Sequence, residues 1–356
     1  MPPFSETVAR LGRPDEAAAG ATAAHLDRLT KPRGSLGRLE AVAVQLAGIA
    51  GESPPPVPEP GVVAVFAGDH GVLAEGVSPW PAEVTAQMVA NFCAGGAAIN
   101  VLARHAGAGV VVVDVGVASE LDAADGLVRA KVRPGTANLA EEPAMTPEET
   151  TTALGVGADM AADLVLKGAR CLVTGDMGIG STTPSAALIA AFTGHAAPAV
   201  TGRGTGIGDD EWARKVRVVE RGLARTGAFG AVPGDDPLAV LASLGGLEIA
   251  ALAGFIVGGA AARVPVLVDG VIAVAAAVVA EALAPGCTAY CVAGHRSSEP
   301  GATVGLDHLG LLPLLDLELR LGEGTGACLA LPVLQAAARI VREMATFDSA
   351  GVSDKT

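Results

Sequence analysis

The sequence is poor in aromatic residues and in positive charge. Aromatic residues make up only 3% of the 356 residues, and Lys and Arg number 24 against 38 Asp and Glu. The net charge of −14, without any basic stripe, argues against nucleic acid as a partner. A phosphorylated ligand must therefore be met by a local cluster of positive groups. Half of the residues are hydrophobic and 47 are glycine, a mixture typical of an α/β protein with many strand–helix turns.

The chain also lacks cysteine pairs, a leader segment and a long unbroken apolar run. Its five Cys residues form no C-x-x-C pair, which indicates buried, reduced thiols in a cytoplasmic protein rather than a metal site. Residues 1–13 are polar, unlike a signal peptide. The apolar stretch 177–202 is broken by proline and glycine, and 249–262 is too short to cross a bilayer. We therefore expect no membrane insertion.

One pattern recurs along the middle of the chain. A short Val-rich run ends in glycine and a polar residue, and a helix-like segment follows. Apolar runs without alternation are typical of strands buried on both faces, and helical spacers between them imply parallel crossovers. The sequence therefore predicts an α/β fold with a doubly wound, mostly parallel, Rossmann-like sheet of about six strands. The six runs are 62–68, 110–113, 172–175, 199–202, 264–268 and 290–294.

Polar residues follow these runs. Each alone would be an ordinary strand-end cap, but the carboxyl ends of parallel strands meet at one edge, so together they predict a ligand site. The turn-rich segment 71–81, which contains Trp80, is expected to form a lid or pocket wall before a helix near 84–102. Residues 117–150 are expected to be a surface excursion. The strand-end residues are Asp69, His70, Asp114, Asp176, Arg203, Asp269 and His295.

The two ends of the chain are expected to be helical. Ser35 could cap a helix that runs to about Ile49. Residues 51–61 contain five prolines and can be neither helix nor central strand, which places a boundary there. We expect three parts: residues 1–60 as the helical part of a small domain plus linker, 61–305 as the α/β nucleotide-binding core, and 306–356 as a segment that carries a catalytic loop and rejoins the small domain.

The first of three glycine-rich loops spans residues 175–185 and leads into an Ala-rich helix. Thr182 or Thr183 is expected to cap this helix, with Pro184 at its first position. Such a loop leaves backbone N–H groups free beside the positive end of the helix dipole, which suits a phosphate. A tight turn alone would also explain the glycines, but Asp176 at the strand end favours a ligand site. The candidate binding residues are Gly178, Ile179, Gly180 and Thr182.

The second loop, residues 202–209, has the same rhythm, and its candidate binding residues are Gly202, Arg203 and Gly204. Arg203 adds a fixed positive charge. Lys215, on the following helix, either points back to the loop or lies on a solvated face. Neither loop is a Walker A motif, and the helix caps fall at the wrong spacing for a dinucleotide fingerprint.

The third loop, residues 319–327, places Glu323 between two glycines at the start of a helix. We expect an exposed carboxylate that the helix N-terminus keeps ionised, as a general base requires. A glutamate that only braces a tight turn is the alternative.

Together these motifs resemble the nicotinate-nucleotide–dimethylbenzimidazole phosphoribosyltransferase family. The resemblance implies an enzyme that transfers the phosphoribosyl group of nicotinate mononucleotide to 5,6-dimethylbenzimidazole or a related base. The products would be α-ribazole 5′-phosphate and nicotinate, in assembly of the nucleotide loop of cobalamin. It also implies a Rossmann-like sheet, a small domain built from both chain ends, and a homodimer. The matching segments, in order along nearly the whole chain, are 30–37, 68–71, 75–78, 177–184, 202–206 and 321–326.

The resemblance also implies roles for single residues. Glu323 matches the catalytic base of the family, and the loops at 175–183 and 202–206 match its nucleotide-binding segments. Two positions depart from the family, since Asp176 replaces a longer Glu and Ser181 replaces Asn. We expect Asp176 to act as the second catalytic carboxylate. Further substrate-binding residues by this resemblance are Ser78, Gln87, Lys215, Leu321 and Gly322.

The chemistry fits these residues without a metal or a cofactor. The cationic ring nitrogen of nicotinate mononucleotide already activates nicotinate to leave, and the incoming base must lose one N–H proton. One carboxylate base is therefore enough, while a second could orient the ribose. Two rival interpretations remain: a dinucleotide-dependent oxidoreductase, which shares the sheet and glycine loops, and a non-enzymatic nucleotide-binding protein.

Overall fold

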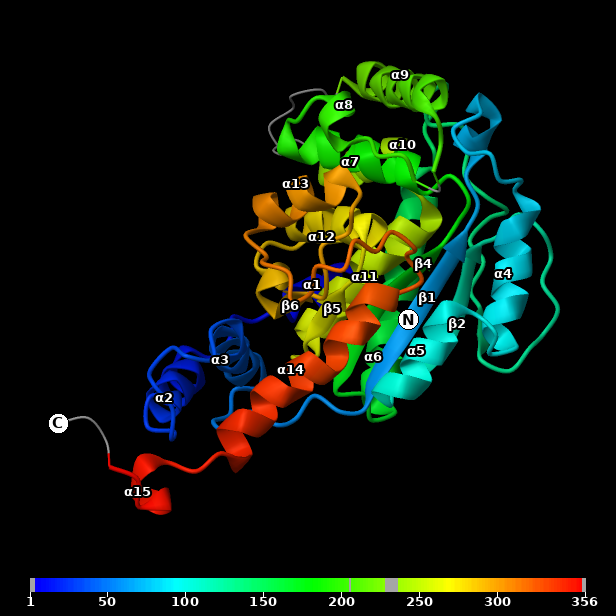
Figure 1. Cartoon of the computed structure of the whole chain (residues 1–356). Helices are drawn as coiled ribbons and strands as arrows, with labels where there is room; N and C mark the ends of the chain where they lie inside the picture. The colour runs from blue at the N-terminus through cyan, green and yellow to red at the C-terminus, as the bar shows by residue number, and fades with distance from the viewer. Residues whose placement is uncertain (1–3, 205, 228–235, 354–356) are drawn as a thin grey trace.

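The computed structural model describes residues 4–204, 206–227 and 236–353. Its centre is a six-stranded sheet in the order β3-β2-β1-β4-β5-β6, with every neighbouring pair parallel (Figure 1). The chain reverses its direction of winding between β1 and β4, which makes this the switch point of a doubly wound sheet. The predicted α/β class is confirmed. The strands are β1 (Gly61–Gly68), β2 (Gly109–Gly116), β3 (Leu127–Arg129), β4 (Cys171–Met177), β5 (Val266–Val268) and β6 (Cys291–Ala293).

Helices cover both faces of the sheet, because each strand is apolar on both sides. Along β1, Ala64 and Phe66 enter one core while Val63 and Val65 enter the other. On the first face, α11 and α12 lie against the strands, and α1 and α6 pack against α11. The bounds are α1 (Phe4–Ala9), α6 (Pro147–Leu166), α11 (Leu247–Ala261) and α12 (Val271–Leu283).

An outer layer of helices closes over α12, and three helices cover the other face (Figure 1). Because α11 and α12 are buried among helices and strands, they are apolar on all sides. The outer layer comprises α7 (Thr182–Thr193), α8 (Ala197–Val200), α9 (Asp209–Thr226), α10 (Pro237–Leu244) and α13 (Pro300–Leu309). The opposite face holds α4 (Glu83–Cys93), α5 (Ala98–Ala106) and α14 (Thr325–Glu343).

Three predicted elements are wrong. Residues 199–202 do not form a strand, because residues 199 and 200 end the short helix α8, which begins at Ala197 and has Pro198 in its first turn. The sixth strand is β3, which lies inside the segment 117–150 that we predicted to be a surface excursion. The helix predicted near 84–102 is two helices, α4 and α5, separated by a turn in which Gly95 has a φ of +77°.

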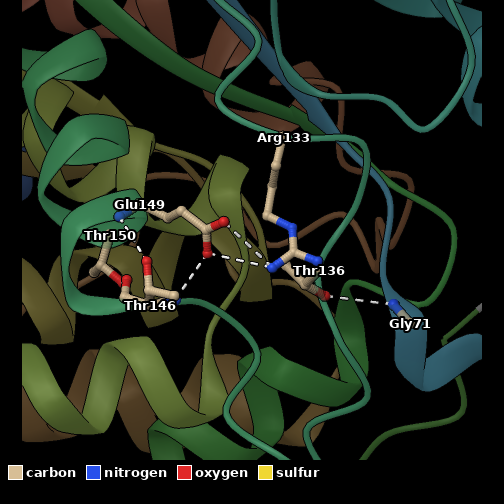
Figure 2. A network of polar contacts seen from close by, with 6 residues as sticks. All are labelled: Gly71, Arg133, Thr136, Thr146, Glu149 and Thr150. Atoms are coloured by element: carbon tan, nitrogen blue, oxygen red, sulfur yellow. Dashed lines mark hydrogen bonds and ion pairs between the residues drawn. The ribbon is translucent and has the colours of Figure 1, made fainter.

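The polar segment before α6 is tied firmly to the fold (Figure 2). Thr146 and Glu149 form a capping box, in which the Glu149 N–H donates to Thr146 Oγ1 at 3.1 Å and the Thr146 N–H donates to Glu149 Oε2 at 2.8 Å. Arg133 pairs with the same carboxylate at 3.3 Å. The Gly71 N–H donates to Thr136 Oγ1 at 3.4 Å, so this segment also fixes the short helix η1 (Gly71–Glu75) after β1.

The chain ends meet on α14. Helices α2 (Glu16–Leu26) and α3 (Arg38–Ala50) pack against each other and against α14. Gly37, with a φ of +54°, precedes α3 as its N-cap, so the predicted Ser35 cap is wrong. Of the predicted linker 51–61, residues 51–60 contain neither helix nor strand, as predicted, but Gly61 is the first residue of the central strand β1. The division into domains stays a prediction. The short elements η2 (Cys287–Tyr290) and α15 (Phe347–Ala350) complete the described chain.

Within the described residues, one stretch is long and apolar enough by composition to cross a membrane. It is Glu83–Ala106, of which 28% is buried. This stretch is α4 and α5 together, and the turn between them interrupts it in the middle.

Candidate functional site

A cavity of about 640 Å³ lies at the carboxyl ends of the strands, beside the switch point between β1 and β4. This is where open α/β sheets bind ligands, and the volume is in the usual range for small-molecule sites. Val77, Ser78 and Trp80 form one wall, as predicted for the segment after β1. The two glycine loops and the segment 318–323 form the others.

The loop after β4 is pressed against the end of β1. A Cβ on Gly178 would lie 2.3 Å from the Gly68 carbonyl oxygen, so only glycine fits there. The Ile179 N–H donates to Thr85 Oγ1 at 3.2 Å and is not free for a ligand. Ser181, not Thr182 or Thr183, is the N-cap of α7, and no side chain of the described chain caps the helix there. The predicted cap is therefore wrong, and Pro184 is the third residue of α7 and not the first. Backbone carbonyls accept the N–H groups of Ser181, Thr183 and Ser185, so fewer N–H groups are left for a ligand than the loop predicted.

Lys215 points into the cavity and not into solvent. Its side chain is buried on α9, and Nζ donates to Thr182 Oγ1 at 2.6 Å. Burial lowers the pKa of Lys215 to about 8, although the nearby Glu299 carboxylate opposes this shift. The ammonium therefore lies beside the first residue of α7, where a phosphate would add a strong negative partner.

The second glycine loop is held by a carboxylate that the sequence analysis missed. The Gly204 N–H donates to Oε1 of the buried Glu299 at 2.8 Å. Glu299 precedes the proline that starts α13, and this helix-start position was its only signal in the sequence. Arg203, on the outer side of the loop, forms an ion pair with Asp209 and stacks on Trp212 at 5.9 Å.

Glu323 occupies an unusual backbone conformation. Its φ is +62°, between Gly322 at +81° and Gly324 at +88°. This left-handed turn is docked on β4, since a Cβ on Gly175 would lie 2.8 Å from the Glu323 carbonyl oxygen. A non-glycine residue held at positive φ is strained, and such strain is typical of functional sites.

The carboxylate of Glu323 is buried, contrary to our prediction of an exposed group. The residue is 5% exposed, and Oε2 accepts a hydrogen bond of 3.3 Å from the Ile99 N–H at the start of α5. Burial raises the pKa of Glu323, the Ile99 N–H partly counteracts the rise, and the charge of Asp269 adds to it. The predicted ionising effect of the helix N-terminus is therefore outweighed.

Asp176 lies opposite this turn at the end of β4. It is buried, and among the described residues its Oδ1 has no hydrogen-bond partner. A Cβ on Gly322 would lie 3.1 Å from that oxygen. Burial raises the pKa of Asp176 well above its usual range, and the charges of Asp269, Glu248 and Glu323 add to the effect. An unpartnered acid facing a cavity is available to a ligand.

A buried ion pair supports the first glycine loop from below. His70 Nε2 lies 2.8 Å from Glu248 Oε1, and both side chains are buried. Burial alone would lower the pKa of His70, but the Glu248 carboxylate raises it above the ordinary value. The sequence predicted His70 at this edge but missed Glu248. The glycine at 246 was the available signal, because a Cβ there would lie 2.6 Å from the His70 ring.

All but two of the candidate catalytic and substrate-binding residues line the cavity, whereas four of the predicted strand-end residues, Asp69, His70, Asp114 and Asp269, do not. Gln87 is exposed on α4, outside the lining. Gly202 lines a neighbouring cavity of about 510 Å³, where a Cβ would lie 2.0 Å from Glu299 Oε2.

Comparisons with known proteins agree along the whole chain. A family model described as phosphoribosyltransferase matches residues 11–352. The nicotinate-nucleotide–dimethylbenzimidazole phosphoribosyltransferase of Salinispora tropica is 56% identical over 99% of this chain and 100% of its own. That of Geobacter sulfurreducens is 54% identical over 93% of each. The crystal structure of the Thermus thermophilus enzyme is 50% identical, with a TM-score of 0.90 over 96% of this chain and 100% of its own. The chain therefore belongs to the nicotinate-nucleotide–dimethylbenzimidazole phosphoribosyltransferase family.

Proposed function

We propose that this protein transfers the phosphoribosyl group of nicotinate mononucleotide to 5,6-dimethylbenzimidazole or a related base. The products are α-ribazole 5′-phosphate and nicotinate, a step in the assembly of the nucleotide loop of cobalamin. One observation carries this proposal beside the family membership. A single cavity joins a cationic, glycine-rich end to an end with apolar walls and two buried carboxylates.

The cationic end suits the 5′-phosphate. Lys215 and the start of α7 lie side by side, since Nζ donates to Thr182 Oγ1 at 2.6 Å. The second loop also lies close to this ammonium, since a Cβ on Gly204 would lie 3.5 Å from Lys215 Nζ. In a chain with a net charge of −14, this local positive cluster is what attracts an anionic nucleotide.

The apolar end suits a flat aromatic base. Val77, Val84, Met88 and Leu321 line it with Trp80 at the rim. Few polar groups fix the base there, so shape and the position of its N–H decide which bases react.

The reaction follows from these positions. A lone pair of the base attacks C1′, the bond from C1′ to the nicotinate nitrogen breaks, and its electron pair neutralises the pyridinium charge. Glu323 takes the N–H proton of the base, and its raised pKa makes it a stronger base than an ordinary glutamate. Asp176, unpartnered at Oδ1, orients the ribose. Attack from the opposite face converts a β- into an α-glycosidic bond.

The proposal is tested by incubating the purified protein with nicotinate mononucleotide and dimethylbenzimidazole and separating the products. Equimolar nicotinate and α-ribazole 5′-phosphate are expected. No nicotinate release, with the protein stabilised against heat by the nucleotide, would indicate a non-enzymatic binding protein. Stabilisation by NADH instead would favour the oxidoreductase.

We also propose that the protein is a cytoplasmic homodimer. The resemblance of its motifs to the family supports this, as do two apolar side chains at the rim of the cavity. Trp80 is 51% exposed and Leu321 is 57% exposed. Contact with a second subunit would remove this apolar surface from water. Light scattering on a size-exclusion column should give twice the chain mass, and a monomer mass would contradict the proposal.

A further inference from the structure

The Glu323 turn does not hold itself in place. Three successive residues in the left-handed region, one of them a glutamate, make a conformation that the chain alone would leave. The surrounding structure must therefore supply the contacts that fix it. In the described part of the chain the Glu323 side chain makes one hydrogen bond, with the Ile99 N–H at 3.3 Å, which orients the carboxylate but not the backbone of the turn.

The backbone of the turn is bound by Asp269 at the end of β5. Oδ2 of Asp269 accepts from the Gly324 N–H at 3.2 Å, and Oδ1 accepts from the Ala327 N–H at 2.8 Å. The Asp269 carboxylate therefore closes the start of α14, where a negative charge is favourable. Its own backbone N–H donates to Thr174 Oγ1 at 3.0 Å, two residues before Asp176. One aspartate thus joins the strand that carries Asp176 to the turn that carries Glu323.

His295 fixes Asp269 from the far side. Its Nε2 lies 3.3 Å from Asp269 Oδ1, with both side chains buried. The ring is wedged over the first turn of α14, since a Cβ on Gly326 would lie 2.0 Å from the His295 Cδ2 atom. This close approach explains the glycine after Thr325. Both the carboxylate and the helix start are therefore held by the same imidazole.

We propose that Asp269, braced by His295, is a positioning residue that sets the place of the Glu323 carboxylate relative to Asp176 in the cavity. This inference rests on the proposed function, because Asp269 positions Glu323, the residue that removes the proton from the base in that function. Asp269 need not touch substrate for this role. A bare helix cap is the alternative, in which Asp269 contributes to stability only.

The test compares Asp269→Asn with Asp114→Asn. Asp114 is the matched control, since it is a buried aspartate near the end of β2 and away from the cavity. Its Oδ1 accepts from the Val117 N–H at 2.9 Å and its Oδ2 lies 3.6 Å from Lys131 Nζ. Both variants should lower the melting temperature. Only Asp269→Asn should lower kcat, by roughly 10- to 100-fold if the carboxylate moves by about 1 Å, with the KM for the nucleotide little changed.

Two further readouts separate positioning from stability. In a Glu323→Gln background Asp269→Asn should lower kcat hardly at all, because it acts through the missing carboxylate. The acid limb of the kcat profile should also move to lower pH. The groups around Glu323 are Asp176 on β4, Asp269 after β5, His295 after β6 and Cys328 on α14. Removing the Asp269 charge removes a cause of the raised Glu323 pKa.

Equal losses of kcat in the two backgrounds, or an acid limb that stays in place while kcat follows thermal stability, would overturn the proposal. If Asp269→Asn does not fold, His295→Gln replaces it, in the wild-type protein and in the Glu323→Gln variant. His295→Gln should then lower kcat in the wild-type background and hardly at all in the Glu323→Gln background. Failure of the proposed function is a separate result, since the wild-type protein would then form no α-ribazole 5′-phosphate.

Discussion

At the scale of single residues, the proposed chemistry depends on Glu323 and the carboxylates near it. Glu323→Gln should lower turnover by roughly 10²–10⁴-fold, the range for loss of a positioned base, while both substrates still bind. Activity of the wild-type protein should rise with pH until Glu323 is ionised. Because burial and Asp269 raise its pKa, this limb should lie above that of an ordinary glutamate, and the substitution should flatten it.

Glu318→Gln is the control for this experiment. Glu318 also has a positive φ, +57°, and borders the same cavity, but its side chain is exposed whereas that of Glu323 is buried. The Glu318→Gln variant should convert substrate at nearly the wild-type rate. If Glu323→Gln is equally active and only less stable, Glu323 braces the turn and takes no part in proton removal.

Lys215 gives a second pH dependence, of opposite sign. Its pKa of about 8 means that the free enzyme loses this positive charge as the pH rises through that value. The kcat/KM for the nucleotide should therefore fall on the alkaline side. Lys215→Arg, which stays charged, should abolish this fall even if the rate is lower throughout. An unchanged alkaline limb in the Arg variant would assign that limb to another group.

At the scale of elements, the role of the glycine loops in binding the nucleotide can be tested separately from the backbone strain that a substitution introduces. Gly178 is unsuitable, because a side chain there would strike the Gly68 backbone at 2.3 Å. Gly204 is better, since its Cβ would lie 3.2 Å from Thr182 Oγ1 and 3.5 Å from Lys215 Nζ. Gly204→Ala should therefore raise the KM for the nucleotide and leave that for the base nearly unchanged.

Gly194→Ala is the matched control for backbone strain. Gly194 has a φ of +74° at the end of α7, and a Cβ there meets nothing within 4 Å. Both variants should lose roughly 1–2 kcal/mol of stability, the cost of an L-residue in the left-handed region. Urea unfolding and substrate kinetics on the two proteins make the comparison. Equal KM values in both would mean that Gly204 shapes only the loop.

Elements were predictable where an apolar run determined them. The strands β1, β2, β4, β5 and β6 follow Val-rich runs, and the structure contains all five. The strand β3 has only three residues, half-buried at the sheet edge, so no long apolar run marks it. At 199–202 the apolar run was misleading, because its first two residues end the short helix α8, which has Pro198 in its first turn.

The site was predictable to the extent that its residues lie in glycine loops or at strand ends. Asp176, Asp269 and His295 could be grouped at one edge because parallel strands place their carboxyl ends together. Glu248 and Glu299 could not, since each precedes or begins a helix without a motif. Burial was also out of reach: the glycines beside Glu323 indicated an open carboxylate, yet α5 covers it through Ile99.

At the scale of the whole molecule, the fold gathers four carboxylates near one cavity in an already acidic chain. Asp176, Glu248, Asp269 and Glu323 come from different parts of the sequence, and the sheet edge brings their charges within mutual influence. Such a cluster invites comparison with a divalent cation site, in which carboxylate oxygens hold Mg²⁺ beside a phosphate.

The partners of these carboxylates argue against a cation site. Glu248 is paired with His70, and both oxygens of Asp269 accept backbone N–H groups of the Glu323 turn. Only Asp176 and Glu323 remain, and Oε2 of Glu323 already accepts a hydrogen bond from the Ile99 N–H. Within the described residues, no group of three or more His, Cys, Asp or Glu side chains has metal-binding geometry.

Activity should therefore survive exhaustive chelation. The leaving nicotinate carries its own positive charge and needs no Lewis acid, and Lys215 meets the phosphate in place of a cation. Turnover is measured after dialysis against EDTA and again after adding Mg²⁺, Mn²⁺ or Zn²⁺. Rates within error of the untreated protein are expected at every step. A loss of activity that one cation restores would show that Asp176 and Glu323 bind metal when substrate is present, and the proton-removing role of Glu323 would then have to be abandoned.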